Sequence, residues 1–223
     1  MDVKLFFREI GNIGSSFSPV VLDHIPELGA TVGCEQRNPY HKHDVAKHII
    51  ETVKVSNALG SLSGISADIF NLSALLHDIG KPLVKKWDEK RKIDRFFNHA
   101  RVSSEMAELI LSRFLIDDRD KETVIFLVKN HDYQIDLNAG KYGDKPFEER
   151  FRYISEKYGA NLVALLLLGI CDSLAQNPAK SAPNVKKGLE YLKKANVRAF
   201  EGTVRYIKEH NPNGVWDTAT EGI

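Results

Sequence analysis

The sequence predicts an all-α fold in which the helices pack around one core. Apolar residues recur at three- and four-residue spacing along most of the chain, which is the period of an amphipathic helix. No segment shows the clean alternation of apolar and polar residues expected of a half-buried strand, and no internal repeat indicates a solenoid. The length of 223 residues fits one large domain, or one domain with a small appendage.

Two helices are predicted in the first part of the chain. The first spans 44–59 and ends at Gly60, and its inward stripe consists of Val45, His48, Ile49, Thr52, Val53 and Leu59. The second spans 67–77, and Gly80 stops it. Histidines therefore lie on the inward stripe of the first helix and at the end of the second.

The middle of the chain is predicted to contain one loop and two helices. Residues 81–98 lack a helical period, so we expect a loop with some extended character. An amphipathic helix follows at 99–115, with inward positions Val102, Met106, Leu109, Ile110 and Phe114. The next helix, at 120–131, has one face made of Val124, Leu127, Val128 and His131.

The last part of the chain begins with a polar loop predicted at 138–146. Helices are then expected at 146–157, 160–176 and 184–209. The longest apolar stretch, LVALLLLGIC at 162–171, has ten residues. Because a helix needs roughly 20 apolar residues to span a bilayer, we expect this stretch to be a buried core helix and no membrane to be a partner.

Composition is that of a soluble globular protein, with 43% apolar and 27% charged residues. The formal net charge of +1 creates no overall field for nucleic acid or an anionic membrane, so phosphate binding has to be local. Cys34 and Cys171 are the only cysteines and lack metal-type spacing, which excludes a disulfide framework and suits a reducing compartment. We therefore expect a cytoplasmic protein.

Six polar residues lie where the helical pattern expects the core or its edge: His48, His77, Asp78, His99, His131 and Asp172. Burying an unpaired imidazolium or carboxylate costs several kcal/mol, about 2–7 even for a neutral polar group. Convergence of all six on divalent metal would offset these costs together, because imidazole and carboxylate are common metal ligands. Taken alone, each histidine is better explained as a satisfied core residue, and each aspartate as a helix cap.

The order H…HD…H…H…D, centred on HDIGK at 77–81, resembles the HD-domain phosphohydrolase superfamily. The chain resembles in particular the HD domain of bacterial tRNA CCA-adding enzymes. The motifs that carry this resemblance are HDIGKP, DEK, FxxH at 96–99, NH and CDSLAQNP, preceded by IPEL and NPYHKHDVAKH. This resemblance covers roughly 25–178. It implies an HD domain at 36–180, an N-terminal helical extension at 1–35, and a C-terminal helix and tail at 181–223 that pack on it.

The resemblance implies which residues bind metal. His48, His77, Asp78 and Asp172 match the core site of the family, and His99 and His131 match the ligands added in members with two ions, where Asp78 bridges. Asp132 competes with His131 for its role. The expected cofactor is a divalent metal, with two ions of Mn²⁺, Fe²⁺, Ni²⁺, Co²⁺ or Mg²⁺, since an N/O ligand set does not choose among them.

Several neighbouring residues have two interpretations. Lys81 either neutralises charge on the phosphoryl group, which makes it catalytic with Asp78, or is a cation favoured at a helix C-terminus. Arg101 and Lys129 are candidate substrate-binding residues, or simply solvated. Asp44 either orients the His48 ring or caps the helix. His41 and His43 either line the mouth of the site or are exposed.

The leading hypothesis is a metal-dependent phosphohydrolase, in which metal-activated hydroxide attacks a phosphomonoester or phosphodiester. The resemblance implies a small-molecule phosphate ester, a nucleotide or an RNA end as substrate, and 2′,3′-cyclic phosphodiesterase, 2′-nucleotidase or phosphatase activity. One alternative is a signalling-nucleotide phosphodiesterase, although the Gly-Tyr-Pro loop of some such enzymes is absent. The other is a non-catalytic HD module that binds RNA or a nucleotide.

The CCA-adding enzymes carry a nucleotidyltransferase head, marked by a Gly-Ser turn followed by a D-x-D pair. This chain has GSSFSP at 14–19 but no D-x-D pair near it. Two carboxylates are needed to hold the metal that activates the attacking hydroxyl. We therefore expect an HD module that stands alone and does not add nucleotides.

Overall fold

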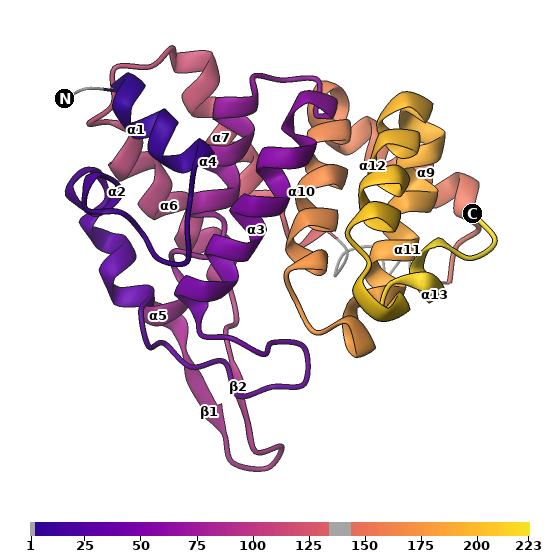
Figure 1. Ribbon diagram of the computed structural model, residues 1–223, viewed down its shortest axis with the longest axis horizontal. Helices are drawn as coiled ribbons and strands as arrows, with labels where there is room; N and C mark the ends of the chain where they lie inside the picture. Colours follow the sequence, from indigo (N-terminus) through magenta and orange to yellow (C-terminus); the bar gives the residue numbers. More distant parts are fainter. Residues whose placement is uncertain (1–2, 134–143) are drawn as a thin grey trace.

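The computed structural model describes residues 3–133 and 144–223, and it is mostly helical (Figure 1). The predicted all-α fold is confirmed, because the described residues contain only a small two-stranded sheet. At the N-terminus, α1 (Val3–Gly11) and α2 (Pro19–His24) are followed by a 3-10 turn, η1 (Pro26–Thr31). Helix α1 packs on α4, so the N-terminal segment covers one side of the core.

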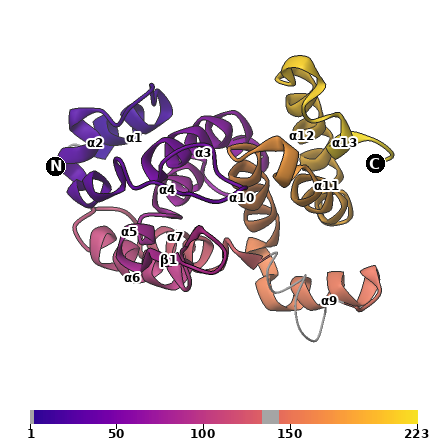
Figure 2. The same ribbon diagram turned by 90° about the horizontal axis from the view of Figure 1, so that it is seen from below.

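Helices α3 (Val45–Leu59), α4 (Ala67–Leu76) and α10 (Leu162–Leu174) form the centre of the core, and η2 (Gly60–Leu62) lies between α3 and α4. Almost every side chain of α4 and α10 is buried, as expected of helices that are apolar all round. Figure 2 shows α10 between the N-terminal helices and the C-terminal ones. The polar residues that end α4 and α10 therefore lie at the edge of the most deeply buried part of the protein.

Helices α6 (His99–Leu111) and α7 (Asp118–Asn130) pack on each other, and α7 packs on α4. Helix α6 ends at Leu111, four residues before the end predicted for the helix at 99–115. The inward position predicted for Leu109 is wrong, since its side chain is 72% exposed. Helix α6 buries Ala107 in its place, and Ile110 is buried as predicted.

The segment predicted as a loop with extended character contains a short helix, α5 (Lys81–Val84), and an antiparallel hairpin. The hairpin consists of β1 (Lys86–Asp88) and β2 (Ile93–Arg95), and it projects from the helical body (Figure 1). Asp94 anchors it: the carboxylate accepts hydrogen bonds from Nε and Nη2 of Arg37, each at 3.0 Å. The Arg37 guanidinium also lies 4.5 Å from the centre of the Trp87 ring.

The C-terminal part contains α9 (Phe147–Tyr158), η4 (Gly159–Asn161), α11 (Pro178–Ala195), α12 (Val197–Glu209), η5 (Pro212–Gly214) and α13 (Asp217–Thr220). The single helix predicted at 184–209 is wrong, because it is two helices that break at Asn196. The Asn196 backbone is extended, with φ −159°, and its side-chain oxygen accepts a hydrogen bond from the Ala199 N–H. Asn196 therefore caps α12 where α11 ends. Most of the loop predicted at 138–146 lies outside the described residues.

One segment, Phe147–Leu174, is long and apolar enough to cross a membrane by length and composition alone. In the folded protein, however, α10 packs on α3, α4 and α11, and its leucines are buried. The apolar stretch at 162–171 is thus a core helix, as predicted.

Candidate metal centre

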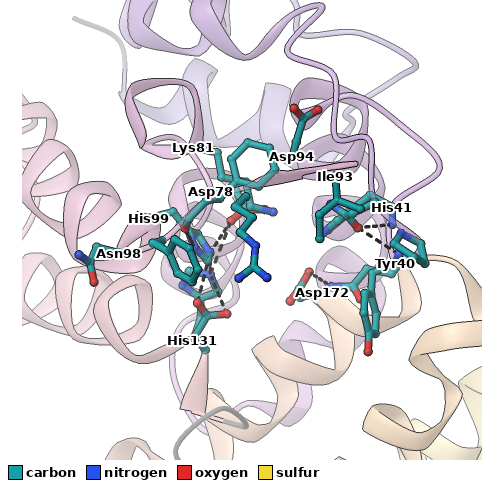
Figure 3. Close-up of a pocket in the computed structure, with 17 residues that line it drawn as sticks. Tyr40, His41, Asp78, Lys81, Ile93, Asp94, Asn98, His99, His131 and Asp172 are labelled. Carbon is teal, nitrogen blue, oxygen red and sulfur yellow. Dashed lines mark hydrogen bonds and ion pairs between the residues drawn. The ribbon is translucent and has the colours of Figure 1, made fainter. Parts of the chain in front are cut away.

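Five helices bring the six predicted ligands to one place. His48 comes from the middle of α3, while His77 and Asp78 directly follow α4. His99 begins α6, His131 follows α7, and Asp172 lies near the end of α10. Figure 3 shows Asp78, His99 and His131 converging at one end of a cavity, with Asp172 across it. Helix ends meet here, so the polar side chains replace what would otherwise be core.

Four of these residues form what we call the inner cluster: His48, His77, Asp78 and Asp172. His48 Nε2 lies 2.9 Å from Asp172 Oδ1 and 3.3 Å from Asp78 Oδ2. His77 Nε2 lies 3.2 Å from Asp78 Oδ2 and 3.4 Å from His48 Nε2. The amide of Gln176 donates a hydrogen bond to Asp172 Oδ1 at 3.0 Å, which fixes that carboxylate.

Asp78, His99 and His131 form the outer cluster. The other oxygen of Asp78, Oδ1, lies 3.2 Å from His99 Nε2 and 3.6 Å from His131 Nε2. The Nε2 atoms of the two histidines are 3.1 Å apart. Asp132 is adjacent, with Oδ2 3.3 Å from His99 Nε2. Asp78 therefore belongs to both clusters and directs one oxygen at each.

Backbone carbonyls fix the tautomers of three histidines. Nδ1 of His77, His99 and His131 donates a hydrogen bond to the carbonyl three residues earlier, at 2.7, 2.9 and 2.7 Å. Because a carbonyl only accepts, each Nδ1 carries the proton in the neutral ring and each Nε2 presents a lone pair. This arrangement aims metal-binding nitrogens at the centre of the site and holds the rings in place.

The crowding of these acceptor atoms is the test of whether a metal fits. The Nε2 atoms of His99 and His131 lie 3.1 Å apart, and when both rings are neutral, as metal ligands must be, neither has a proton to share there. Both oxygens of Asp78 are buried and have no hydrogen bond from the described residues, although the Lys81 ammonium forms an ion pair with Oδ2 at 2.6 Å. A cation in each cluster would satisfy these acceptors at once. The residues therefore fit divalent metal, with nitrogen and oxygen donors.

The charges of the site shift its pKa values far from their usual range. Burial lowers the pKa of His131, but the charges of Asp132 and Asp78 outweigh burial and raise it to about 9. Burial likewise opposes protonation of His48, yet Asp172 and Asp78 raise its pKa. For Asp78, burial is outweighed by His77 and Lys81, which hold the pKa of the carboxyl well below its usual range. The carboxylates are therefore ionised and available as ligands.

Lys81 lies inside the site rather than on a solvated helix end, with 4% of the residue exposed. Its Nζ is 2.6 Å from Asp78 Oδ2 and donates a hydrogen bond to Gln36 Oε1 at 2.9 Å. The geometry therefore favours the interpretation in which its charge acts at the site. Gln36 was missed in the sequence, because a glutamine in an irregular segment gives no periodic signal.

The other predicted residues lie around this centre. Asp44 caps α3, since its carboxylate accepts from the Lys47 N–H at 2.8 Å, and among the described residues this carboxylate makes no hydrogen bond or ion pair with the His48 ring. His41 lines the cavity, and its ring packs edge-on against that of His48 at 4.9 Å. Burial lowers the pKa of His41 to about 2, so the ring is neutral. His43 is half-buried and does not line the cavity.

Arg101 and Lys129 do not line this cavity. Arg101 follows His99 by two residues on α6, and Lys129 precedes His131 by two residues at the end of α7, and positions i and i+2 face different directions. Both line a neighbouring hollow of about 340 Å³, which shares Phe97, Asn98 and Asp132 with the main cavity. Arg101 is exposed and pairs with Glu105. Their predicted contact with substrate stays a prediction.

The metal centre opens into a cavity of about 470 Å³. One wall is the irregular segment before α3, which includes Tyr40 and His41, and the facing wall is β2 with the turn that follows it, residues 93–98. Figure 3 shows Ile93 and Tyr40 on the side away from His99. A cavity of this size admits a nucleotide-sized ligand, with the metal ligands at its inner end.

Two comparisons with known proteins bear on this site. Residues 45–177, more than half of the chain, match a protein family described as HD domain. A CC-adding tRNA nucleotidyltransferase of Thermus thermophilus is 32% identical over 108 residues. That match covers 48% of this chain but 24% of the relative, so the chain spans about a quarter of the relative's length. Both matches agree with the resemblance carried by the order of the histidines and aspartates.

Proposed function

Because the chain belongs to the HD domain family, we propose that it is a metal-dependent phosphohydrolase acting on a phosphomonoester or phosphodiester of a nucleotide or RNA end. One observation carries this proposal: four histidines from four helices meet around the two oxygens of Asp78 at the inner end of an open cavity, and Asp172 contacts one of them, His48. A site built only to stabilise the fold has no need of such an opening.

The residues of the site divide into those that would hold metal and those that would stabilise charge on the substrate. His48, His77, Asp78 and Asp172 would hold one ion, and Asp78, His99 and His131 a second. Divalent ions bound there supply a nucleophile at neutral pH and positive charge for the phosphate oxygens. Asp78 takes part in both clusters, which makes it the residue on which catalysis depends most.

Lys81 acts from the side of the cavity. Its ammonium is held by Asp78 and Gln36, so it is fixed in place before any substrate enters. A preorganised cation of this kind stabilises charge that develops on the phosphoryl group, because it need not reorient during the reaction. Lys81 is therefore proposed as catalytic, together with Asp78.

The substrate class follows from the size of the cavity and from the relative. The name of the Thermus protein says that it acts on tRNA, which supports a nucleotide or an RNA end here. Cyclic 2′,3′-phosphates, 2′-phosphates and simple phosphomonoesters are the esters to test first.

The test is metal removal and reconstitution. We would strip the protein with a chelator, add Mn²⁺, Fe²⁺, Ni²⁺, Co²⁺ or Mg²⁺ separately, and measure hydrolysis of bis-p-nitrophenyl phosphate, 2′,3′-cyclic AMP and 2′-AMP. Turnover that depends on added metal supports the proposal. Tight metal binding with no turnover of any ester would refute it and favour the non-catalytic module.

A further inference from the structure

We propose that the β1–β2 hairpin binds the single-stranded end of an RNA and leads it into the cavity of the metal centre. The inference names the substrate class of the proposed phosphohydrolase, and it rests on that function. The hairpin projects beside the cavity, and its second strand is part of the cavity wall (Figures 1 and 3). A molecule bound along β2 would therefore lie in the same cavity as the candidate metal ligands.

Positive charge is concentrated on this segment. Residues 81–98 contain seven lysines and arginines and three acidic residues, a surplus of four, although the whole chain carries only +1. Lys86, Lys90 and Arg91 are exposed, and none of them has an acidic partner among the described residues. A positive field that the overall charge lacks is thus present locally, on the hairpin whose second strand lines the cavity.

The register of the hairpin separates its two faces. Trp87 pairs with Asp94, and Arg37 ties this face to the body of the protein. Lys86 pairs with Arg95 on the other face, and Arg95 lines the cavity. Like charges directly opposite each other across a ladder are destabilising. Arg95 has a partner in Asp88 at 2.8 Å, but Lys86 has none in the described structure, so an anion bound beside the pair would stabilise it.

Exposed aromatic rings accompany the cations. Phe97 is 64% exposed, Tyr40 47% and Trp87 38%, and the first two line the cavity. Guanidinium groups already cover one side of two of them: Arg95 lies 5.0 Å from the Phe97 ring and Arg37 4.5 Å from the Trp87 ring. The free sides are flat apolar surfaces at which an unpaired base can stack. Cations for phosphates beside rings for bases are the combination that binds single-stranded nucleic acid.

A binding measurement with two matched variants tests this. The hairpin variant replaces Lys86, Lys90 and Arg91 with Gln, and the control variant makes the same change at Arg198, Arg205 and Lys208. The control residues are exposed cations on α12, which lies away from the hairpin in Figure 1. Fluorescence anisotropy of a labelled single-stranded RNA of about ten nucleotides measures affinity over a range of salt concentrations.

We expect the hairpin variant to bind this RNA at least about tenfold more weakly at low salt, and its log–log salt slope to fall by about 2. The control variant should bind like the wild type, and unchanged melting temperatures would show that both variants fold. Quenching of Trp87 emission by the RNA, absent in Trp87→Phe, reports stacking directly. An abasic oligonucleotide of equal length should bind more weakly than the RNA, because it keeps the phosphates and lacks the bases.

Equal affinity of the hairpin variant and the wild type would overturn the proposal. So would equal affinity for the abasic oligonucleotide, or binding to phosphatidylserine vesicles in place of RNA. These measurements distinguish failure of the RNA-binding proposal from failure of the phosphohydrolase proposal. If the wild type hydrolyses no ester but still binds RNA through the hairpin, the phosphohydrolase fails and the RNA-binding surface stands. If it hydrolyses small esters and the hairpin charges do not affect RNA binding, the reverse holds.

Discussion

The two clusters that share Asp78 differ in what supports them. The inner cluster is held by helices of the central core: its His48 side chain is 1% exposed, and only Asp172, at 17%, lines the cavity together with the shared Asp78. The outer cluster includes His99, whose side chain is 14% exposed and lines the cavity. The His99 ring is oriented by the Phe96 carbonyl, which belongs to the turn after β2. The inner cluster thus depends on the core, whereas the outer one also depends on the hairpin.

This difference predicts that the two clusters bind metal with different affinities. A ligand set fixed by the central helices loses little entropy on binding metal, so an ion in the inner cluster should bind more tightly. An ion in the outer cluster would be held partly by His99, whose orientation depends on the rim of the cavity. The predictions below test how far the two clusters are independent.

Replacing Asp78 with Asn should have the largest effect, because it removes the carboxylate charge on which both clusters rely. We expect loss of both metal equivalents and a fall in turnover of at least about 10³-fold, while far-UV circular dichroism stays helical. Metal analysis after gel filtration measures the first effect. Asp118→Asn is the matched control, since that side chain is 92% exposed. Retained turnover in Asp78→Asn would show that the site is elsewhere.

Replacing one histidine in each cluster should separate them. His99→Ala should leave one equivalent of metal and weaken the second by at least about tenfold, whereas His48→Ala should reduce both. The reason is that His48 Nε2 lies 3.3 Å from Asp78 Oδ2 and 2.9 Å from Asp172 Oδ1, so its loss removes the ring that lies between these two carboxylates and loosens Asp78, which both clusters share. His210→Ala, at an exposed histidine, is the control. Equal effects of His48→Ala and His99→Ala would mean that the clusters form one indivisible site.

Replacing Lys81 with Gln should lower kcat by about 10²-fold and change metal content little. Lys81 contacts the Asp78 oxygen of the inner cluster, but it also lines the cavity, so its charge is available to substrate. Steady-state kinetics with metal analysis on the same sample distinguishes the two roles. Lys121→Gln on α7 serves as the control. If metal is lost in proportion to kcat, Lys81 supports the ligands rather than the reaction.

Helical periodicity singled out polar residues that interrupt an apolar pattern, and the resemblance to the HD-domain superfamily then implied that they bind metal. His48 lies on the inward stripe of α3, and Asp172 near the end of an apolar helix. Gly80 was interpreted only as a helix stop, but a side chain there would place Cβ 2.6 Å from the Ser103 backbone nitrogen. The close approach of α6 behind the HDIGK segment therefore requires glycine, and it positions the helix that carries His99.

Contacts between irregular segments could not be predicted in this way. Gln36 reaches Lys81 and Arg37 reaches Asp94, and each pair joins parts of the chain 45 to 57 residues apart. Such pairs leave no periodic signal, since Gln36 and Arg37 both lie in the irregular segment before α3. For the same reason the sequence did not reveal that Arg37 anchors the hairpin through Asp94, or that residues 93–98 form a wall of the cavity. Arg101 and Lys129 were selected by proximity in sequence, which on a helix is not proximity in space.

The anchor of the hairpin gives the smallest predicted effect, and it tests the link between rim and outer cluster. Hydrogen bonds from Arg37 lower the pKa of Asp94 from 3.8 to about 2. A carboxyl whose pKa is lowered by folding stabilises the folded state above its unfolded pKa, and that contribution is lost as pH falls from about 4 to about 2. The difference in unfolding free energy between wild type and Asp94→Asn should therefore be largest near neutrality and shrink with acid.

Asp94→Asn should also weaken the outer metal ion and leave the inner one bound. The side chain is buried and contacts neither cluster, so an effect on the outer ion has to pass through β2 and the Phe96 carbonyl to His99. Hydrogen exchange of the amides of residues 86–95 reports loosening of the hairpin, and metal titration reports the second ion. Faster exchange with unchanged binding of both ions would show that the hairpin only guides substrate, and that the outer cluster is supported by α6 and α7 alone.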